Sequence, residues 1–163
     1  MGNSVKKNKP LVLILMGSPS DKEWCKKIQV ELEKFSISSI LRIASAHKVP
    51  EITIEIIRKT DSDLIITVAG RSNALSGLTD GCTPKPVIAC PPLDEQNILY
   101  DLYSTIRMPS GIAPLLILTP ENAALAAAKI IGIRDTDVRK KVEEFQLNQR
   151  NKLIEADEEL LNG

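Results

Sequence analysis

Aromatic side chains are scarce in this chain of 163 residues, where they make up 3% of the sequence. Proteins that bind single-stranded nucleic acid stack bases on such side chains, so this class is disfavoured. An excess of charge is missing as well, because 21 lysines and arginines balance 21 aspartates and glutamates. Binding to nucleic acid or an anionic membrane requires a surplus of positive charge. We therefore expect no nucleic acid and no membrane partner.

Cysteines and long apolar runs are also few. Cys25, Cys82 and Cys90 are odd in number and lack paired spacing, so they predict neither a disulfide framework nor a zinc site. Free cysteines are typical of a reducing compartment, and we expect the protein to be cytoplasmic. The apolar run Leu11–Met16 is about a quarter of a membrane span. Because Gly17 and the polar residues after it stop this run, no signal peptide is expected.

Apolar residues make up 43% of the chain and gather in five short continuous runs. Such runs are typical of strands buried on both faces of a parallel sheet. Segments of helical spacing separate them, which predicts a three-layer α/β sandwich with a parallel five-stranded flavodoxin-like sheet of order 2-1-3-4-5. The expected strands are Leu11–Met16, Ile40–Ile43, Leu64–Val68, Val87–Ala89 and Leu115–Leu118. The expected helices are Asp21–Phe35, Pro50–Lys59, Asn73–Asp80, Asp94–Ile106 and Glu121–Ile131.

The two ends of the chain fall outside this alternation. We expect residues 1–9 to be a flexible segment, residues 10–134 the α/β catalytic domain and residues 135–163 a helix. Apolar positions are sparse in this last segment, namely Val138, Val142, Phe145, Leu153 and Leu161. The helix either packs on its own domain or lies as an arm on a neighbouring subunit, and we favour the arm.

The first candidate ligand segment follows the first expected strand, because ligands bind beyond the carboxyl ends of parallel strands. Gly17 allows a tight turn, and Ser18 and Ser20 offer hydroxyl groups. Asp21 opens a helix whose free amide groups suit an anion or a sugar hydroxyl. Ordinary capping of that helix by Ser20 or Asp21 is the alternative.

The second candidate segment holds His47, the only histidine, between Ser45 and Lys48. Histidine suits proton transfer near neutral pH, and lysine can hold a phosphate as a point charge. A lone histidine is more often structural, but this one stands beside a lysine at the end of an expected strand. We therefore interpret it as catalytic. No second histidine or suitable cysteine lies at ligand spacing, so no metal site is expected.

The third candidate segment begins with Gly70, Arg71, Ser72 and Asn73. Its small residues let the backbone approach a ligand, and its polar residues offer contacts. It contains neither the Gly-x-Gly-x-x-Gly spacing of dinucleotide sites nor the Gly-Lys-Ser/Thr of phosphate-binding loops. A plain loop with a helix cap is the alternative.

Two later segments carry weaker signals. Cys90 precedes Pro91 and Pro92, where a cis prolyl bond would shape a tight turn. Cys90 is disfavoured as a nucleophile because the single histidine is already assigned elsewhere. The segment Arg107–Gly111 is either a helix end with a turn or a lid or subunit contact.

Four motifs together resemble the aminoimidazole ribonucleotide (AIR) carboxylase family of purine biosynthesis, with the same order and spacing over residues 10–160. They are Leu15-Met16-Gly17-Ser18-Pro19-Ser20-Asp21, Ser45-Ala46-His47-Lys48, Ala69-Gly70-Arg71-Ser72-Asn73 and Met108-Pro109-Ser110-Gly111. The resemblance implies an enzyme that acts on small-molecule substrates, aminoimidazole ribonucleotide and carbon dioxide, and needs no metal, biotin or other cofactor. It also implies a homo-oligomer, an octamer with pockets at subunit junctions.

The family has two branches. One is a mutase that moves a carboxylate from the exocyclic nitrogen of N5-carboxyaminoimidazole ribonucleotide to ring carbon 4, and the other carboxylates that carbon with carbon dioxide. The mutase typically has arginine after the histidine and a second histidine in an Ala-His-Leu-Pro-Gly stretch. This chain has Lys48 and Asn73-Ala74-Leu75-Ser76-Gly77 instead, so it resembles the carbon dioxide-using branch more closely.

The resemblance also implies roles by position. His47 would be the general acid/base, Ser18 and Asp21 would hold the ribose and phosphate, and Ser45 and Lys48 would act at the phosphate and the histidine turn. Gly70 and Ser72 would line the pocket for carbon dioxide or carboxylate. The secondary candidates are Gly17, Ser20, Arg71 and Asn73.

A non-catalytic flavodoxin-like nucleotide-binding module is the remote alternative. A receiver module needs an acidic cluster after the first strand and a phosphorylatable aspartate after the third. Asp21 stands alone, and no aspartate directly follows the third strand. A flavin module needs aromatic stacking partners, whereas Trp24, Tyr100 and Tyr103 lie within helical patterns.

Overall fold

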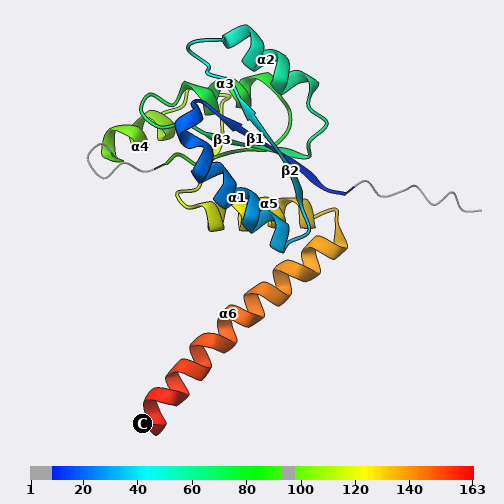
Figure 1. Ribbon diagram of the computed structural model, residues 1–163, viewed down its shortest axis with the longest axis vertical. Helices are drawn as coiled ribbons and strands as arrows, with labels where there is room; N and C mark the ends of the chain where they lie inside the picture. The colour runs from blue at the N-terminus through cyan, green and yellow to red at the C-terminus, as the bar shows by residue number, and fades with distance from the viewer. Residues whose placement is uncertain (1–8, 93–97) are drawn as a thin grey trace, which may run out of the picture.

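A computed structural model describes residues 9–92 and 98–163 (Figure 1). Its five-stranded sheet has the order β2-β1-β3-β4-β5, and every neighbouring pair is parallel. The strands are β1 (Leu11–Met16), β2 (Ser38–Ile43), β3 (Leu64–Val68), β4 (Val87–Ala89) and β5 (Leu115–Leu116). The helices are α1 (Lys22–Lys34), α2 (Pro50–Lys59), α3 (Ala74–Cys82), α4 (Ile98–Ile106), α5 (Pro120–Gly132) and α6 (Thr136–Asn162). The predicted fold class and strand order are confirmed.

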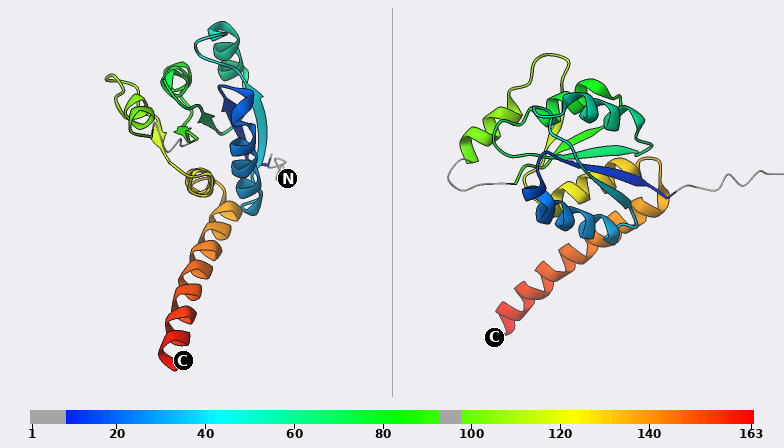
Figure 2. Two further views of the ribbon diagram at one scale, coloured as in Figure 1. Left: turned by 60° about the vertical axis from the view of Figure 1, so that its left-hand side comes forward. Right: turned by 45° about the horizontal axis from the view of Figure 1, so that its top comes forward.

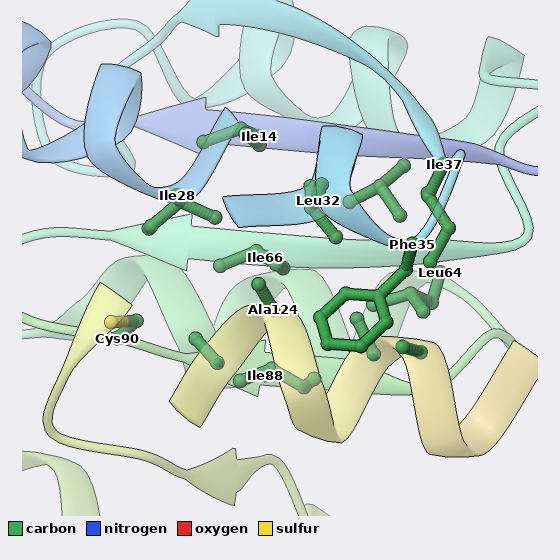
Figure 3. Packing of buried hydrophobic residues seen from close by; sticks show 14 of the residues in the cluster. Ile14, Ile28, Leu32, Phe35, Ile37, Leu64, Ile66, Ile88, Cys90 and Ala124 are labelled. Atoms are coloured by element: carbon green, nitrogen blue, oxygen red, sulfur yellow. The ribbon is translucent and has the colours of Figure 1, made fainter. Parts of the chain in front are cut away.

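Helices cover both faces of the sheet, as the expected three layers require. Helices α1 and α5 lie on one face, with α2 and α3 on the other (Figures 1 and 2). Against the first face, Ile28 and Leu32 of α1 and Ala124 of α5 pack with Ile66 and Ile88 of the strands (Figure 3). Burying an isoleucine or leucine side chain contributes about 1.5–3 kcal/mol, so this aliphatic core fixes the sheet without needing aromatic residues.

The central strands and the two edge strands, β2 and β5, differ in burial. All residues of β3 and β4 are buried, as continuous apolar runs predict. The expectation of burial on both faces is wrong for β2, where Ile40 and Ile43 are 46% and 51% exposed, and for β5, where Leu115 is 47% exposed. Strand β2 lies at the edge of the sheet and pairs only with β1. It also begins two residues earlier than expected, because Ser38 pairs with Leu11 in the parallel register.

Several predicted boundaries move by a few residues. Strand β5 ends at Leu116, and α1 begins after a short 3-10 turn at Pro19–Asp21. Helix α4 is described from Ile98, because residues 93–97, and with them the expected helix start, lie outside the described residues. The proposed flexible segment also lies outside them except for Lys9. No cis peptide bond occurs in the described chain, so the cis expectation at Pro91 and Pro92 is wrong.

The long helix α6 is present and extends away from the domain (Figure 2). Its first turns pack on the chain's own core, where Val138 and Val142 are buried and the Phe145 ring meets Phe35 edge to face at 5.6 Å. Beyond these turns every residue from Gln146 is exposed. The beginning of the helix thus packs on its own domain, while the arm on a neighbouring subunit stays a prediction for its uncovered end.

None of the helices in the described part of the chain is both long enough and apolar enough to span a membrane.

Candidate active site

The turn after β1 is built by close packing and by serine hydroxyls. The Gly17 amide donates to the Val68 carbonyl at 2.9 Å, and a Cβ at Gly17 would lie 3.3 Å from the Cβ of Ala69. Glycine here therefore lets the turns after β1 and β3 approach each other. The Ser18 hydroxyl accepts from the amide and the hydroxyl of Ser20, at 3.3 and 2.8 Å. Ser18 thus caps the short 3-10 turn Pro19–Asp21, whereas Asp21 stands at the N-cap position of α1 without a side-chain capping bond.

Asp21 is partly buried at the start of α1. Burial raises the pKa of Asp21, and this outweighs hydrogen bonds from Ser18 and Ser20 that lower it. Its side chain makes no capping bond to α1. The carboxylate is thus not required by the helix, which is compatible with a role in binding.

The turn after β2 presents His47 and Lys48 on a fixed backbone. The Ala44 amide donates to the Met16 carbonyl at 2.9 Å, which continues the pairing of β1 and β2 past the strand end. The Ser45 hydroxyl accepts from the Lys48 amide at 3.3 Å and closes the turn. The side chains of His47 and Lys48 are both exposed. They are therefore accessible to a ligand, and the only histidine is not a core residue.

The turn after β3 contains a non-glycine residue in the left-handed region. Arg71 has φ +58°, a conformation that costs free energy for a residue with a Cβ and is often found at functional sites. Asn73 is buried, and its side-chain oxygen accepts from the Ser76 amide to cap α3. The helix-cap alternative thus applies to Asn73, while Arg71 and Ser72 remain exposed.

These three turns surround a cavity of about 430 Å³ at the carboxyl edge of the sheet. Ten of the eleven residues proposed from the sequence line it, namely Gly17, Ser18, Ser20, Asp21, Ser45, His47, Lys48, Gly70, Arg71 and Ser72. The one exception is Asn73, which lies beneath the turn. The roles assigned to these residues stay predictions, but the structure brings the residues together.

The cavity also has apolar walls, formed by residues that were not proposed as site residues. Ala46, Ala69 and Leu75 line it, and apolar residues of this kind are indistinguishable from core residues in a sequence. Met108 was part of a motif, but it packs against α3, where its Sδ would lie 3.1 Å from a Cβ at Gly77. The segment from Arg107 thus forms a helix end and a turn, without lining the cavity.

The chemistry of the cavity follows from its side chains. Lys48 and Arg71 supply two positive charges against the single carboxyl of Asp21, which favours an anionic ligand such as a phosphate. His47 can exchange a proton with a bound molecule. Serine hydroxyls on the turns can bond a sugar or a carboxylate. A nucleotide whose heterocycle gains or loses a proton fits this set.

Cysteine chemistry does not contribute to this site. Cys25 and Cys90 are fully buried, and burial raises the pKa of each thiol to about 12. A thiol with such a pKa is not an effective nucleophile near neutral pH. In residues 9–92 and 98–163, no three or more His, Cys, Asp or Glu side chains lie together as a metal-binding group.

Comparisons with known proteins agree with this picture. A family model described as AIR carboxylase matches residues 11–152. The chain is 53% identical over 150 residues to phosphoribosylaminoimidazole carboxylase of Archaeoglobus fulgidus, which covers 91% of this chain and 83% of that protein. It is 40% identical over 164 residues to the Drosophila melanogaster bifunctional phosphoribosylaminoimidazole carboxylase/phosphoribosylaminoimidazole succinocarboxamide synthetase, covering 98% of this chain and 38% of that protein.

The solved structures include a similar fold. The crystal structure of Treponema denticola PurE has a TM-score of 0.90 and 45% sequence identity, covering 93% of this chain and 99% of that one. The phosphoribosylaminoimidazole carboxylase of the same organism is 44% identical over 156 residues, covering 93% of this chain and 98% of that protein. With the family model matching from β1 into α6, the chain belongs to the AIR carboxylase family of purine-biosynthesis enzymes.

Proposed function

We propose that this protein carboxylates 5-aminoimidazole ribonucleotide reversibly at ring carbon 4 with carbon dioxide, giving 4-carboxy-5-aminoimidazole ribonucleotide in purine biosynthesis. The observation that carries this proposal is the cavity of three turns that exposes the single histidine beside a lysine. Family membership supports the substrate class. The exposed position of His47 supports its role as the general acid/base.

The reaction needs one proton carrier. The electron-rich carbon 4 attacks the carbon of carbon dioxide, and one C=O electron pair moves to oxygen to make the carboxylate. Carbon 4 is then tetrahedral and still carries its hydrogen. His47 removes this proton, and the C–H electron pair restores the aromatic ring. In reverse, His47 returns the proton before carbon dioxide leaves; such a step contributes typically about 10²–10⁴-fold in rate.

The remaining cavity residues bind and orient. Lys48 would hold the phosphate as a point charge, with Ser45 fixing its turn. Ser18 and Asp21 would hold the ribose and phosphate. Gly70 and Ser72 would line the carbon dioxide and carboxylate pocket, where amide and hydroxyl donors stabilise the developing charge. Confining carbon dioxide beside carbon 4 lowers the entropic part of the barrier.

The mutase of the same family is the second candidate. Lys48 and Asn73 stand where the mutase pattern has an arginine and the start of a histidine-containing stretch, which favours the carboxylase. The test is to mix the purified chain with 5-aminoimidazole ribonucleotide and bicarbonate, without an ATP-dependent partner enzyme. Efficient product formation supports the carboxylase. Turnover only with N5-carboxyaminoimidazole ribonucleotide would support the mutase and contradict our proposal.

The assembly and its location complete the proposal. We expect a homo-oligomer, an octamer in which α6 lies on a neighbouring subunit, in the cytoplasm. The support is the uncovered end of α6, where Leu153 and Leu160 are 75% and 83% exposed. Leu153 follows Phe145 by eight residues and Leu160 follows Leu153 by seven, so both lie on the helix face whose first turns already pack on the domain through Val138 and Val142. Leu147, Ile154 and Leu161, each seven residues from the next, form a second apolar stripe.

A further inference from the structure

One hydroxyl group on α4 reaches the turn after β3 from outside the cavity. Ser104 Oγ lies 2.9 Å from the Arg71 carbonyl oxygen, to which it donates, and accepts from the Asn73 amide at 3.2 Å. These two contacts flank Ser72 on both sides. Ser104 Oγ also lies 2.8 Å from the Asp101 carbonyl of its own helix, so the hydroxyl proton is shared between two carbonyls.

The turn that Ser104 contacts has an unfavourable backbone conformation. Arg71 has φ +58°, which a residue with a Cβ adopts only when its surroundings impose it. Arg71 and Ser72 are both exposed, so burial of their side chains does not hold the turn. The bonds of Ser104 to the residues at either side of Ser72 supply a constraint that side-chain burial does not.

A neighbouring residue on α4 fixes the far end of the same turn. Asn73 Nδ2 donates to Thr105 Oγ1 at 3.0 Å, and the Asn73 side-chain oxygen caps α3. Asn73 and Thr105 are both buried, each with 3% of its surface exposed. Thr105 therefore anchors the turn to the core, while Ser104 acts on the part of the turn that faces the cavity.

We propose that Ser104 is a positioning residue for carboxylation, which holds the backbone and hydroxyl of Ser72 toward the carbon dioxide side of the cavity. This inference rests on the proposed function. Ser104 does not line the cavity itself. Its influence is expected on carbon dioxide and the nascent carboxylate, because Ser72 is proposed to line their pocket. The residues proposed to hold the ribose and phosphate, Ser18, Asp21 and Lys48, lie on the turns after β1 and β2.

The test is a kinetic comparison of Ser104→Ala with the unaltered full-length chain, varying bicarbonate and nucleotide separately. We expect the KM for carbon dioxide to rise about tenfold, and the KM for the nucleotide to change less than about twofold. The reason is that the variant frees the turn after β3 and leaves the turns after β1 and β2 in place. Ser104→Thr keeps the hydroxyl and should restore most of the loss. A purely structural defect would not produce this split or this rescue.

Two further variants make the test decisive. Ser62→Ala deletes a buried hydroxyl in the loop before β3, at the edge of the sheet opposite the cavity, and should leave both KM values unchanged. Ser104→Cys keeps the side-chain volume but bonds weakly, so it should show the same selective rise even where Ser104→Ala fails to fold.

Three outcomes would overturn the inference. The first is that Ser104→Ala or Ser104→Cys has the same KM values as the unaltered chain. The second is an equal rise of both KM values, and the third is that Ser104→Thr does not restore the KM for carbon dioxide. The proposed function is tested separately by the parent chain, whose lack of carboxylation would overturn both. An active parent with an unaffected Ser104→Ala variant would overturn the positioning role alone.

Discussion

The carboxyl edge of the sheet and the outer part of α6 are both uncovered in the single chain, but they differ in chemistry. At the edge, polar side chains such as His47 and Lys48 stand on short turns tied to the strands by backbone bonds. On α6, apolar side chains such as Leu153 and Leu160 stand on a helix that leaves the domain. A rigid polar cavity suits a small charged ligand, whereas an apolar helix face suits another protein surface.

Helix α6 also differs from the helix before it in how many of its residues are buried. Helix α5, with 13 residues, buries seven of them, including Ala123, Ala127 and Ile131. Helix α6 has 27 residues and buries two, Val138 and Val142. Each apolar side chain left exposed forgoes about 1.5–3 kcal/mol of possible burial energy. The outer part of α6 therefore gains stability mainly when a partner covers it, and variants of the two regions should have separable effects.

The largest effect is expected from the cavity. His47→Asn should reduce turnover by about 10²–10⁴-fold, because His47 is the general acid/base of the proposed reaction and an asparagine side chain cannot take up its proton. Nucleotide binding and subunit assembly should remain, since the exposed side chain supports neither α6 nor the core. A spectrophotometric decarboxylation assay measures the turnover, and light scattering measures the assembly. Near-normal turnover would end the catalytic assignment.

The next largest effect is expected from α6. Leu153→Glu combined with Leu160→Glu should dissociate the assembly, because two charges would enter an apolar contact. Removing everything after Arg134 would be less informative, since it also uncovers the core at Val138 and Val142. Activity should fall with dissociation, given pockets at subunit junctions.

The matched control for that pair adds the same charge elsewhere on the helix. Asn148→Glu with Asn151→Glu changes exposed polar positions outside both apolar stripes and should leave light scattering unchanged. An intact assembly in the leucine variant, or equal dissociation in both variants, would contradict the role of the arm.

A smaller effect is expected for the phosphate contact. Lys48→Ala should raise the KM for the nucleotide about tenfold and change kcat little, because a phosphate contact binds the ground state and the transition state alike. Steady-state kinetics with varied nucleotide measure both constants. Lys129→Ala removes an exposed lysine from α5 and serves as the control. An unchanged KM in Lys48→Ala would remove the lysine from the binding site.

The smallest effect is expected on stability. Burial raises the pKa of Asp21 in the folded chain, so the ionised carboxylate is less favourable there than in the unfolded chain. Above the folded pKa this group therefore destabilises the fold, and below the unfolded pKa it does not. Asp21→Asn should raise Tm slightly at pH 7, by less than about 2 °C, and leave Tm unchanged near pH 3 in the ligand-free protein.

Calorimetry at the two pH values checks this prediction. Asp61→Asn, at an exposed position at the other edge of the sheet, should show no change at pH 7. A lower Tm for Asp21→Asn at pH 7 would mean that the carboxylate stabilises the fold.

Much of the fold could be predicted because the core strands carry a local signal. The continuous apolar runs of β1, β3 and β4 match the observed strands residue for residue. The edge strand β2 was harder, because Ser38 and Ser39 belong to it only through pairing with β1. The length of β5 was overestimated, because the apolar run continues beyond Leu116, which forms the last residue pair of the strand with Ala89.

The candidate site shows the same division. Its turns could be located because parallel strands bring their carboxyl ends to one edge, so His47 and Gly70 had to be near each other. Asn73 was assigned to the ligand although it caps α3, because an asparagine that caps and one that binds look alike in a sequence. Ser104 gave no signal, since it is 32 residues from Ser72 and belongs to a different helix.

The order of apolar runs and polar turns along the chain determined the parallel sheet, its strand order and the three turns that hold the chemistry, because these depend on local burial patterns and on a general rule of sheet geometry. Tertiary structure alone decided which strand is exposed, how α6 divides between packing and projection, and that a serine on α4 fixes the turn at Arg71. These features depend on contacts between residues distant in sequence, and local sequence patterns do not encode such contacts.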